Sequence, residues 1–202
     1  MKVFIVRHGD KEKGAYYNKN LRPQDPPLNK KGNQEAQKLI RYFQHIPIKR
    51  IFTSEYLRTT QTAQYIARDK GLQVLKDNRL NEIDNGIIEI MSDKEIEEKY
   101  PEFWNDFSTC IKDVRFPEGE TGEEVKARQK DLLNELIRND EDVLLVSHEG
   151  YMRLLICHIL DIPVYRRKFF KVDMCGIIEL EFNQENEEWS VIRFNQTMNY
   201  IG

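Results

Sequence analysis

The chain has 202 residues, of which 40% are hydrophobic, 10% aromatic and 32% charged, and its formal net charge is −3. This composition suffices for a hydrophobic core, excludes a disordered chain and lacks the overall basicity of a nucleic-acid-binding protein. The length predicts a single domain over residues 1–202, and no apolar run reaches the ~18 residues that a membrane span needs. Three widely spaced cysteines exclude a disulfide framework and a thiolate metal site. The apolar run at the N-terminus is too short for a signal-peptide core, so we expect a cytoplasmic protein.

Short apolar runs alternate with helical patterns in the first half of the chain. Asn29 precedes a segment with apolar residues at helical spacing, so we expect it to cap a helix. Ser54 follows a short apolar run and is expected to cap a second helix. The predicted elements are strands at Val3–Val6, Arg50–Thr53 and Leu72–Leu75, and helices from Asn29 to about Gln44 and from Ser54 to about Asp69.

The second half of the chain continues this alternation and ends in a hairpin. Ser92 with Glu95, and Thr121 with Glu124, have the spacing of capping boxes, which predicts that a helix begins at each place. The other predicted elements are a strand at Asp142–Val146, a helix from Glu149 to about Leu160, and strands at Cys175–Phe182 and Trp189–Phe194 joined by the polar turn Asn183–Glu188.

Unbroken apolar strands that alternate with helices are typical of an α/β domain. We therefore predict a mostly parallel central sheet with helices on both faces, and an antiparallel pair of strands near the C-terminus. Two connections are too long for ordinary loops, namely Asp10–Leu28 and Asn85–Glu120, the second with helical content inside it. Long connections in a compact domain are often functional lids, so both are candidate lids.

Histidine and arginine residues follow three of the predicted strands. Arg7-His8-Gly9 follows the first strand, Arg58 lies one helical turn beyond the second, and Ser147-His148-Glu149-Gly150 follows a later buried strand. Because ligands bind outside the carboxyl ends of parallel strands, these side chains converge on one edge of the sheet. Each feature alone is also compatible with a structural residue or a surface cation, but together they predict a functional site. The other two histidines, His45 and His158, are interpreted as structural.

This cluster suits phosphoryl transfer. Arginine guanidinium groups bind phosphate oxygens through a bidentate fork and stay charged at any working pH. A neutral imidazole can act as a nucleophile, and its pKa near neutrality leaves the attacking nitrogen readily free of its proton. The N-terminus of the helix predicted after His148 adds amide donors and a favourable dipole for an anion. The chain contains no Walker loop, GxGxxG turn or HExxH motif that would favour another assignment.

The same residues resemble the histidine phosphatase superfamily, the group that includes the cofactor-dependent phosphoglycerate mutases. The resemblance extends from Arg7-His8-Gly9 to Ser147-His148-Glu149-Gly150, and the ordered set of motifs is far more specific than any single one. It implies a phosphoglycerate mutase-like fold. The intermediate motifs are Leu28-Asn29 with Gly32, the segment from Thr53-Ser54 through Leu57-Arg58-Thr59 to Gln61-Thr62-Ala63, Arg79-Leu80-Asn81-Glu82, and Gly119-Glu120-Thr121.

The resemblance also implies a role for each site residue. His8 would be the nucleophile that becomes phosphohistidine, and Arg7, Arg58 and His148 would bind the phosphoryl oxygens. Glu82 would protonate the leaving oxygen and then activate water; without the resemblance it would be one of several candidate acids. No metal or other cofactor is expected, and the sequence offers no obvious set of metal ligands. The predicted phosphate-binding residues are Arg7, Gly9, Arg58, His148 and Glu149.

The chain departs from the family pattern near the site. Asp10-Lys11 follows the first motif, where many members have a carboxylate, Gln or Gly followed by Ser or Thr. Gly14 falls near the place of an Asn of the mutases, Glu149 stands where Gly commonly follows the second histidine, and Ile88 replaces a frequent aromatic residue. These changes affect substrate recognition more than the phosphate pocket. They weaken a mutase assignment and leave the phosphatase chemistry intact.

We therefore predict a metal-independent phosphatase, a phosphoric monoester hydrolase of the histidine acid type, that acts on a small phosphorylated substrate. No nucleic-acid or membrane partner is expected, and the sequence does not indicate the oligomeric state. A cofactor-dependent phosphoglycerate mutase is one alternative. An inactive module that binds phosphate or a phosphopeptide is another, from a different class. The basic residues Lys11, Lys13, Lys19 and Arg22 in the first long connection are compatible with a solvated loop or with a lid that favours anionic substrates.

Overall fold

A six-stranded sheet forms the centre of the computed structural model, which describes residues 1–14 and 25–198. The strands are β1 (Lys2–Arg7), β2 (Arg50–Thr53), β3 (Val74–Lys76), β4 (Val143–Ser147), β5 (Ile177–Asn183) and β6 (Glu188–Gln196). Their order is β3-β2-β4-β1-β5-β6, with parallel pairing from β3 to β1 and antiparallel pairing from β1 to β6. This arrangement confirms the predicted α/β class, its mostly parallel sheet and the antiparallel strands near the C-terminus.

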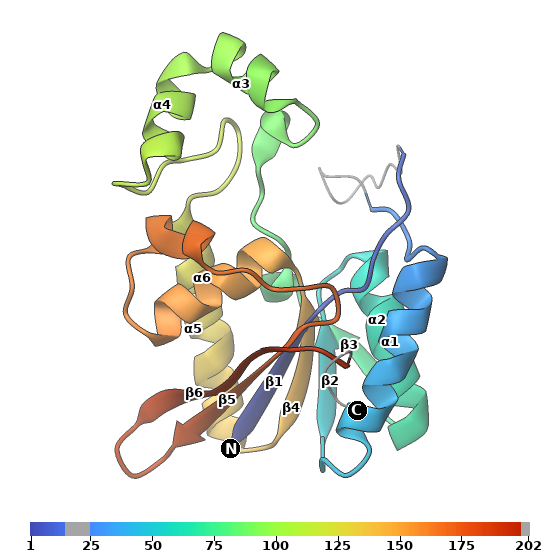
Figure 1. Cartoon of the computed structure of the whole chain (residues 1–202). Helices are drawn as coiled ribbons and strands as arrows, with labels where there is room; N and C mark the ends of the chain where they lie inside the picture. Colours follow the sequence, from blue (N-terminus) through green and yellow to red (C-terminus); the bar gives the residue numbers. More distant parts are fainter. Residues whose placement is uncertain (15–24, 199–202) are drawn as a thin grey trace.

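Helices cover both faces of the sheet, as predicted (Figure 1). The helices are α1 (Lys30–Phe43), α2 (Leu57–Lys70), α3 (Asp93–Lys99), α4 (Pro101–Thr109), α5 (Gly122–Asn139) and α6 (Glu149–Ile159), with short 3-10 helices η1 (Asn78–Leu80), η2 (Gly86–Ile88) and η3 (Val164–Phe169). Along β1, Val3 and Ile5 pack into the core that contains α5 and α6, whereas Phe4 and Val6 pack into the core that contains α1 and α2. A strand that is buried on both faces is apolar at successive positions, which explains its continuous hydrophobic run.

The predicted helix caps at three places are confirmed. The Asn29 side chain accepts a hydrogen bond from a backbone N–H in the first turn of α1 at 2.8 Å. Both capping boxes form, Ser92 with Glu95 at the start of α3 and Thr121 with Glu124 at the start of α5. Each box satisfies backbone N–H groups that a helix N-terminus otherwise leaves without partners.

The prediction that Ser54 caps α2 is wrong. The residue before α2 is Tyr56, and its side chain makes no capping hydrogen bond. The Ser54 hydroxyl instead lies 2.8 Å from Nε2 of His148 and 2.8 Å from the hydroxyl of Thr59. At the end of β2, Ser54 therefore forms a hydrogen bond with the histidine that follows the neighbouring strand β4.

The third strand begins two residues later than predicted, at Val74. The cause is the end of α2, where Gly71 adopts the left-handed conformation with φ 65°. The N–H of Leu72 then donates to the carbonyl of Ala67 at 2.9 Å, which holds Leu72 in the helix terminus and outside the sheet.

The second long connection, Asn85–Glu120, lies beyond the carboxyl ends of the parallel strands and is called the cap below (Figure 1). It contains η2, α3 and α4, which confirms the helical content predicted inside it. The first long connection is described only at its ends, where Lys11 and Leu28 form an isolated antiparallel bridge. Lys19 and Arg22 lie outside the described residues.

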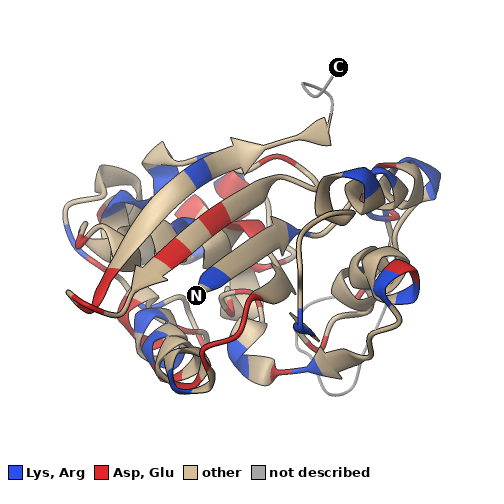
Figure 2. Cartoon of the chain, turned by 90° about the horizontal axis from the view of Figure 1, so that it is seen from below, with Lys and Arg blue, Asp and Glu red and all other residues tan. Residues whose placement is uncertain are grey.

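Basic and acidic residues are mixed over the end of the molecule opposite the cap (Figure 2). Glu179 of β5 is buried there, and its carboxylate pairs with Lys2 at 2.7 Å and with Arg193 of β6. Across residues 1–14 and 25–198, no helix is both long enough and apolar enough to cross a membrane.

Candidate active site

The loop that carries Arg7-His8-Gly9 packs closely against α1 and α2. The N–H of Gly9 donates to the Thr62 hydroxyl of α2 at 3.1 Å. A Cβ atom at Gly9 would meet the carbonyl oxygen of Gly32 in α1 at 2.7 Å, a distance that side chains do not tolerate. Glycine at this position therefore lets the loop approach α1, and the loop places His8 directly at the end of β1.

His8 is buried, with 5% of its surface exposed. Its Nδ1 lies 2.8 Å from the carbonyl oxygen of Gly9. Because a carbonyl oxygen only accepts hydrogen bonds, Nδ1 carries the proton and Nε2 of the neutral ring has a free lone pair. Burial, followed by the charges of Arg58 and Arg7, lowers the pKa of His8 well below its usual value. His8 thus presents an unprotonated nitrogen, which is what a nucleophile requires.

His148 follows β4 and is fully buried beside His8, with the two ring centroids 5.2 Å apart. Nη2 of Arg58 donates to Nδ1 of His148 at 3.1 Å, so Nε2 carries the ring proton and donates to Ser54 at 2.8 Å. Burial and the charge of Arg58 lower the pKa of His148 well below its usual value. The neutral ring of His148 therefore orients the guanidinium of Arg58.

Two arginines reach the site from different elements. Arg58 of α2 is 4% exposed, and its guanidinium carbon lies 4.3 Å from the centre of the Tyr56 ring. Arg7 of β1 donates from Nη1 to the carbonyl of Val172 at 2.6 Å, and its Nη2 pairs with Glu149 at 3.0 Å. Nε of Arg7 is buried and has no hydrogen-bond partner among the described residues. This unused donor borders the site where a phosphoryl group is expected.

Glu82 lies between η1 and η2 and binds the N-terminus of α6. Its Oε1 accepts from the N–H groups of Tyr151 at 2.8 Å and Ile83 at 3.0 Å, and its Oε2 accepts from Gly150 at 3.1 Å. Burial raises the pKa of the Glu82 carboxyl against the opposing effect of these bonds. Two of the amide groups at the N-terminus of α6, those of Gly150 and Tyr151, therefore bind the Glu82 carboxylate.

Two residues that position Glu82 were not found from the sequence. A Cβ atom at Gly150 would lie 2.7 Å from Oε1 of Glu82, so glycine leaves the room that the carboxylate occupies. Arg128 of α5 donates to the carbonyls of Arg79 at 2.7 Å and Glu82 at 3.3 Å, and pairs with Glu120 at 3.1 Å. A signal was available for Arg128, because it is a charged residue on the face of α5 that packs into the core.

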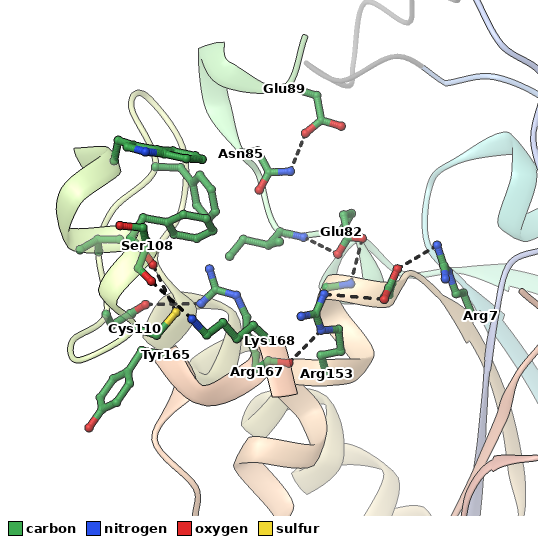
Figure 3. A pocket seen from close by; sticks show the side chains of 18 of the residues that line it. Arg7, Glu82, Asn85, Glu89, Ser108, Cys110, Arg153, Tyr165, Arg167 and Lys168 are labelled. Carbon is green, nitrogen blue, oxygen red and sulfur yellow. Dashed lines mark hydrogen bonds and ion pairs between the residues drawn. The ribbon is translucent and has the colours of Figure 1, made fainter. Parts of the chain in front are cut away.

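Most of the residues described above border a cavity of about 440 Å³ between the sheet edge, α6, η3 and the cap (Figure 3). Gly9 and His148 are buried and do not line it. His45 and His158 do not line it. The described part of the chain has no group of three or more His, Cys, Asp or Glu side chains placed to hold a metal ion. The predicted site residues that line the cavity are Arg7, His8, Arg58, Glu82 and Glu149.

The outer wall of the cavity comes from the second long connection and from η3, a segment for which the sequence predicted no element. Aromatic and basic side chains of the cap and η3 dominate this wall, and none of them was predicted as a site residue. Their positions depend on how the cap folds over the sheet edge, which no local motif encodes. They include Trp104, Phe107, Phe116, Tyr165, Arg167 and Lys168.

Solved structures with the same fold include a putative alpha-ribazole-5'-P phosphatase from Escherichia coli, with a TM-score of 0.81 and 22% identity. The match covers 97% of this chain and 96% of that one. A mycobacterial glucosyl-3-phosphoglycerate phosphatase has a TM-score of 0.80 and 21% identity, with 97% and 99% of the two chains covered. These structures share the predicted phosphoglycerate mutase-like fold.

The sequence comparisons agree with the fold. Phosphoserine phosphatase 1 of Hydrogenobacter thermophilus is 32% identical over 209 residues, which cover 100% of this chain and 90% of the relative. A probable phosphoglycerate mutase of Cronobacter sakazakii is 30% identical over 187 residues, which cover 91% and 86%. The family model of the histidine phosphatase superfamily (branch 1) matches residues 3–197. The chain therefore belongs to the histidine phosphatase superfamily.

Proposed function

We propose that the chain is a metal-independent phosphatase of the histidine acid type, which hydrolyses small phosphomonoesters through a phosphohistidine at His8. This proposal is supported above all by the protonation and hydrogen bonding of His8. Its imidazole is buried and neutral, Nδ1 is tied to the Gly9 carbonyl, and Nε2 is free beside a cavity that Arg7 and Arg58 also line.

In the first step, the Nε2 lone pair of His8 attacks phosphorus, and the ester P–O bond breaks as the N–P bond forms. Arg7 and Arg58 bind the non-bridging oxygens, where charge develops in the transition state. Glu82 gives its proton to the leaving oxygen. The raised pKa of Glu82 supports this role, since a general acid must hold a proton near the working pH.

In the second step, water attacks the phosphorus of phosphohistidine. The Glu82 carboxylate takes a proton from that water, and the N–P bond breaks with its electron pair returning to Nε2 of His8. Phosphate leaves and the starting protonation states are restored. Arginine cations supply the positive charge in both steps, so this scheme requires no metal or other cofactor.

A phosphoglycerate mutase is the second candidate, and the relative named a probable phosphoglycerate mutase favours it. In a mutase, the phosphoryl group of His8 would pass to another substrate oxygen in place of water. Both candidates share the first step and differ in the acceptor. The remaining alternative, a module that binds phosphate or a phosphopeptide without turnover, would make no phosphohistidine.

The test is rapid-quench kinetics with a radiolabelled aryl phosphate in the presence of a chelator. We expect turnover, and a trapped phosphoenzyme that is labile in acid and stable in base. His8→Ala should lose both, whereas His45→Ala, at an exposed position, should retain both. Phosphoserine or phosphoaspartate would contradict the mechanism. Isomerisation of 3-phosphoglycerate that depends on a bisphosphate primer would favour the mutase, and binding without turnover would favour the inactive module.

A further inference from the structure

The cavity extends well beyond the residues that would hold the phosphoryl group. Its volume of about 440 Å³ is that of a site for a whole small molecule. From the end that Arg7 and Glu82 border, it continues beneath the cap toward η3, where Arg167 lies (Figure 3). Phe107 and Phe116 of the cap line this outer part, so the organic portion of a substrate would lie against aromatic rings.

Basic residues outnumber acidic residues among the other residues that line the cavity. Apart from the proposed catalytic groups His8, Arg7, Arg58 and Glu82, five basic and three acidic described residues line it. A cavity wall with this excess of positive charge favours an anionic ligand. The basic residues are Lys11, Lys112, Arg153, Arg167 and Lys168, and the acidic residues are Glu89, Asp113 and Glu149.

Three of these cations have partners for their charge or for a donor, the first being Lys168, whose ammonium donates to the carbonyl of Ser108 at 3.4 Å. The ammonium of Lys112 pairs with Asp106 at 2.7 Å. Arg153 donates from Nε to the carbonyl of Arg167 at 2.8 Å, and its Nη1 lies 3.7 Å from Glu149. Arg153 therefore supports the backbone of η3 and balances Glu149.

Arg167 differs from these cations because its charge is largely buried and only loosely compensated. Its side chain is 12% exposed, and its nearest carboxylate oxygen belongs to Asp113, 3.7 Å from Nη1. The Asp113 carboxylate already accepts the N–H groups of Gly122 at 3.1 Å and Glu123 at 2.9 Å, at the start of α5. Nη1 also donates to the carbonyl of Val164, but this hydrogen bond is long at 3.5 Å.

Aromatic rings hold the guanidinium of Arg167 in this position. Its central carbon lies 5.9 Å from the ring centre of Phe107 and 5.7 Å from that of Phe116. These contacts orient a planar fork with donors left for a ligand, a geometry that matches a carboxylate or a phosphate. Burial lowers the pKa of Arg167, but an arginine keeps its charge at physiological pH.

We infer that Arg167 binds a second anionic group of the substrate, a carboxylate or a second phosphoryl group, while the first phosphoryl group lies at His8. The substrate class is then a phosphomonoester whose organic part also carries an anion. This inference rests on the proposed phosphatase function. It is independent of which organic part joins the two anions.

The test uses a matched series of alkyl phosphates with one to four methylene groups and three kinds of far end. One arm ends in a carboxylate, one in a phosphonate, and one in a neutral carboxamide. For the best chain length we expect kcat/KM to be at least about tenfold higher for an anionic end than for the carboxamide, the size of one charge-assisted hydrogen bond. The carboxylate and phosphonate arms distinguish the two possible anions.

Arg167→Met should remove most of this preference, and Arg167→Lys should retain part of it. Arg166→Met is the matched control, because Arg166 is an exposed arginine of the same 3-10 helix that does not line the cavity. The ratio of the two kcat/KM values is the readout, since damage to the fold or to the phosphoryl chemistry would lower both values together.

Equal kcat/KM for anionic and neutral ends in the wild-type protein would overturn this inference and leave the phosphatase function in place. An unchanged preference in Arg167→Met would also overturn the role of Arg167. If the wild-type protein hydrolysed none of these esters and no aryl phosphate, the phosphatase function would fail, and this inference with it.

Discussion

Gly150 shows how a residue without a side chain can control the proposed acid. A Cβ atom there would lie 2.7 Å from Oε1 and 3.2 Å from Cδ of Glu82. We predict that Gly150→Ala displaces the carboxyl and lowers kcat for alkyl phosphates by about a hundredfold, the usual contribution of a general acid. Formation of the phosphoenzyme from aryl phosphates should be affected much less, because their leaving groups need no proton, and its hydrolysis should then be slow because Glu82 also activates water. Rapid-quench kinetics on both substrates would measure the two steps separately.

The control for this substitution is Gly71→Ala. Gly71 has a φ of 65°, and a Cβ atom there would have no other atom within 4 Å, so alanine causes backbone strain without a clash. We expect a loss of about 1 kcal/mol in the free energy of unfolding, with unchanged kinetics. Equal slowing of phosphoenzyme formation from alkyl and aryl phosphates in Gly150→Ala would contradict a specific effect on Glu82 as the acid.

Glu149 acts on the phosphate site through Arg7. Its carboxylate lies 3.0 Å from Nη2 of Arg7 and 3.7 Å from Arg153, so it competes with a phosphoryl group for the same cation. We predict that Glu149→Gln lowers the inhibition constant of inorganic phosphate by about two- to fivefold, since partly exposed ion pairs contribute up to about 1 kcal/mol. Glu35→Gln is the control, because Glu35 lies on α1 away from the cavity.

The opposite result for Glu149 would also be informative. Weaker inhibition by phosphate in Glu149→Gln would show that the ion pair holds Arg7 in its binding geometry. The direct phosphate contact predicted for Glu149 from its place in the motif would then be the next property to test, by titrating phosphate at several ionic strengths.

At the scale of elements, caps and buried strands were predictable because their signals are local. The Asn29 cap and both capping boxes form where the spacing predicted them. Ser54 was misassigned for a non-local reason: its hydroxyl bonds with His148, which follows a different strand. The buried N–H of His148 needs a hydrogen-bond acceptor, and leaving it without one would cost more free energy than the helix cap would contribute.

The two capping boxes predict that removing a cap costs more stability when its helix buries more residues in the core. Thr121→Ala should lower the free energy of unfolding by about 1 kcal/mol, because α5 has 18 residues and packs several of them into the core. Ser92→Ala removes the same kind of box from α3, which has seven residues and buries only Ile96 among them. We expect a smaller loss there. Urea denaturation would measure both, and equal losses would contradict coupling to the core.

At the scale of the whole molecule, the two ends of the cavity differ in how far they could be predicted. The phosphoryl end is built from strand ends, so a parallel sheet brings Arg7, His8 and His148 together once the strands are recognised. The outer end is built where the cap meets η3. Arg167, the residue there that we propose to bind substrate, lies outside every motif found in the sequence. The environment of Arg167 depends on packing against Phe107 and Phe116.

Buried and partly buried histidines also give the whole molecule a dependence of stability on pH. Burial lowers the pKa values of His8, His148 and His158 in the folded state. In the unfolded chain they titrate near pH 6.5, so below that pH the unfolded state binds protons that the folded state does not. The free energy of unfolding should therefore fall as pH decreases. Glu82 opposes this trend, because its raised pKa lets the folded state bind a proton first.

We predict that His148→Gln weakens this dependence by up to about 1.4 kcal/mol per pH unit below pH ~6.5, the value for one proton. Glutamine can still accept a hydrogen bond from Arg58 and donate one to Ser54, so the variant should fold. Urea denaturation of the wild type, His148→Gln and the exposed control His45→Gln between about pH 7.5 and 5.5 would measure the slopes. An unchanged slope in His148→Gln would mean that His148 is protonated in the folded state. Its Nδ1 could not then accept from Arg58, and the arrangement that orients this guanidinium for phosphate would be wrong.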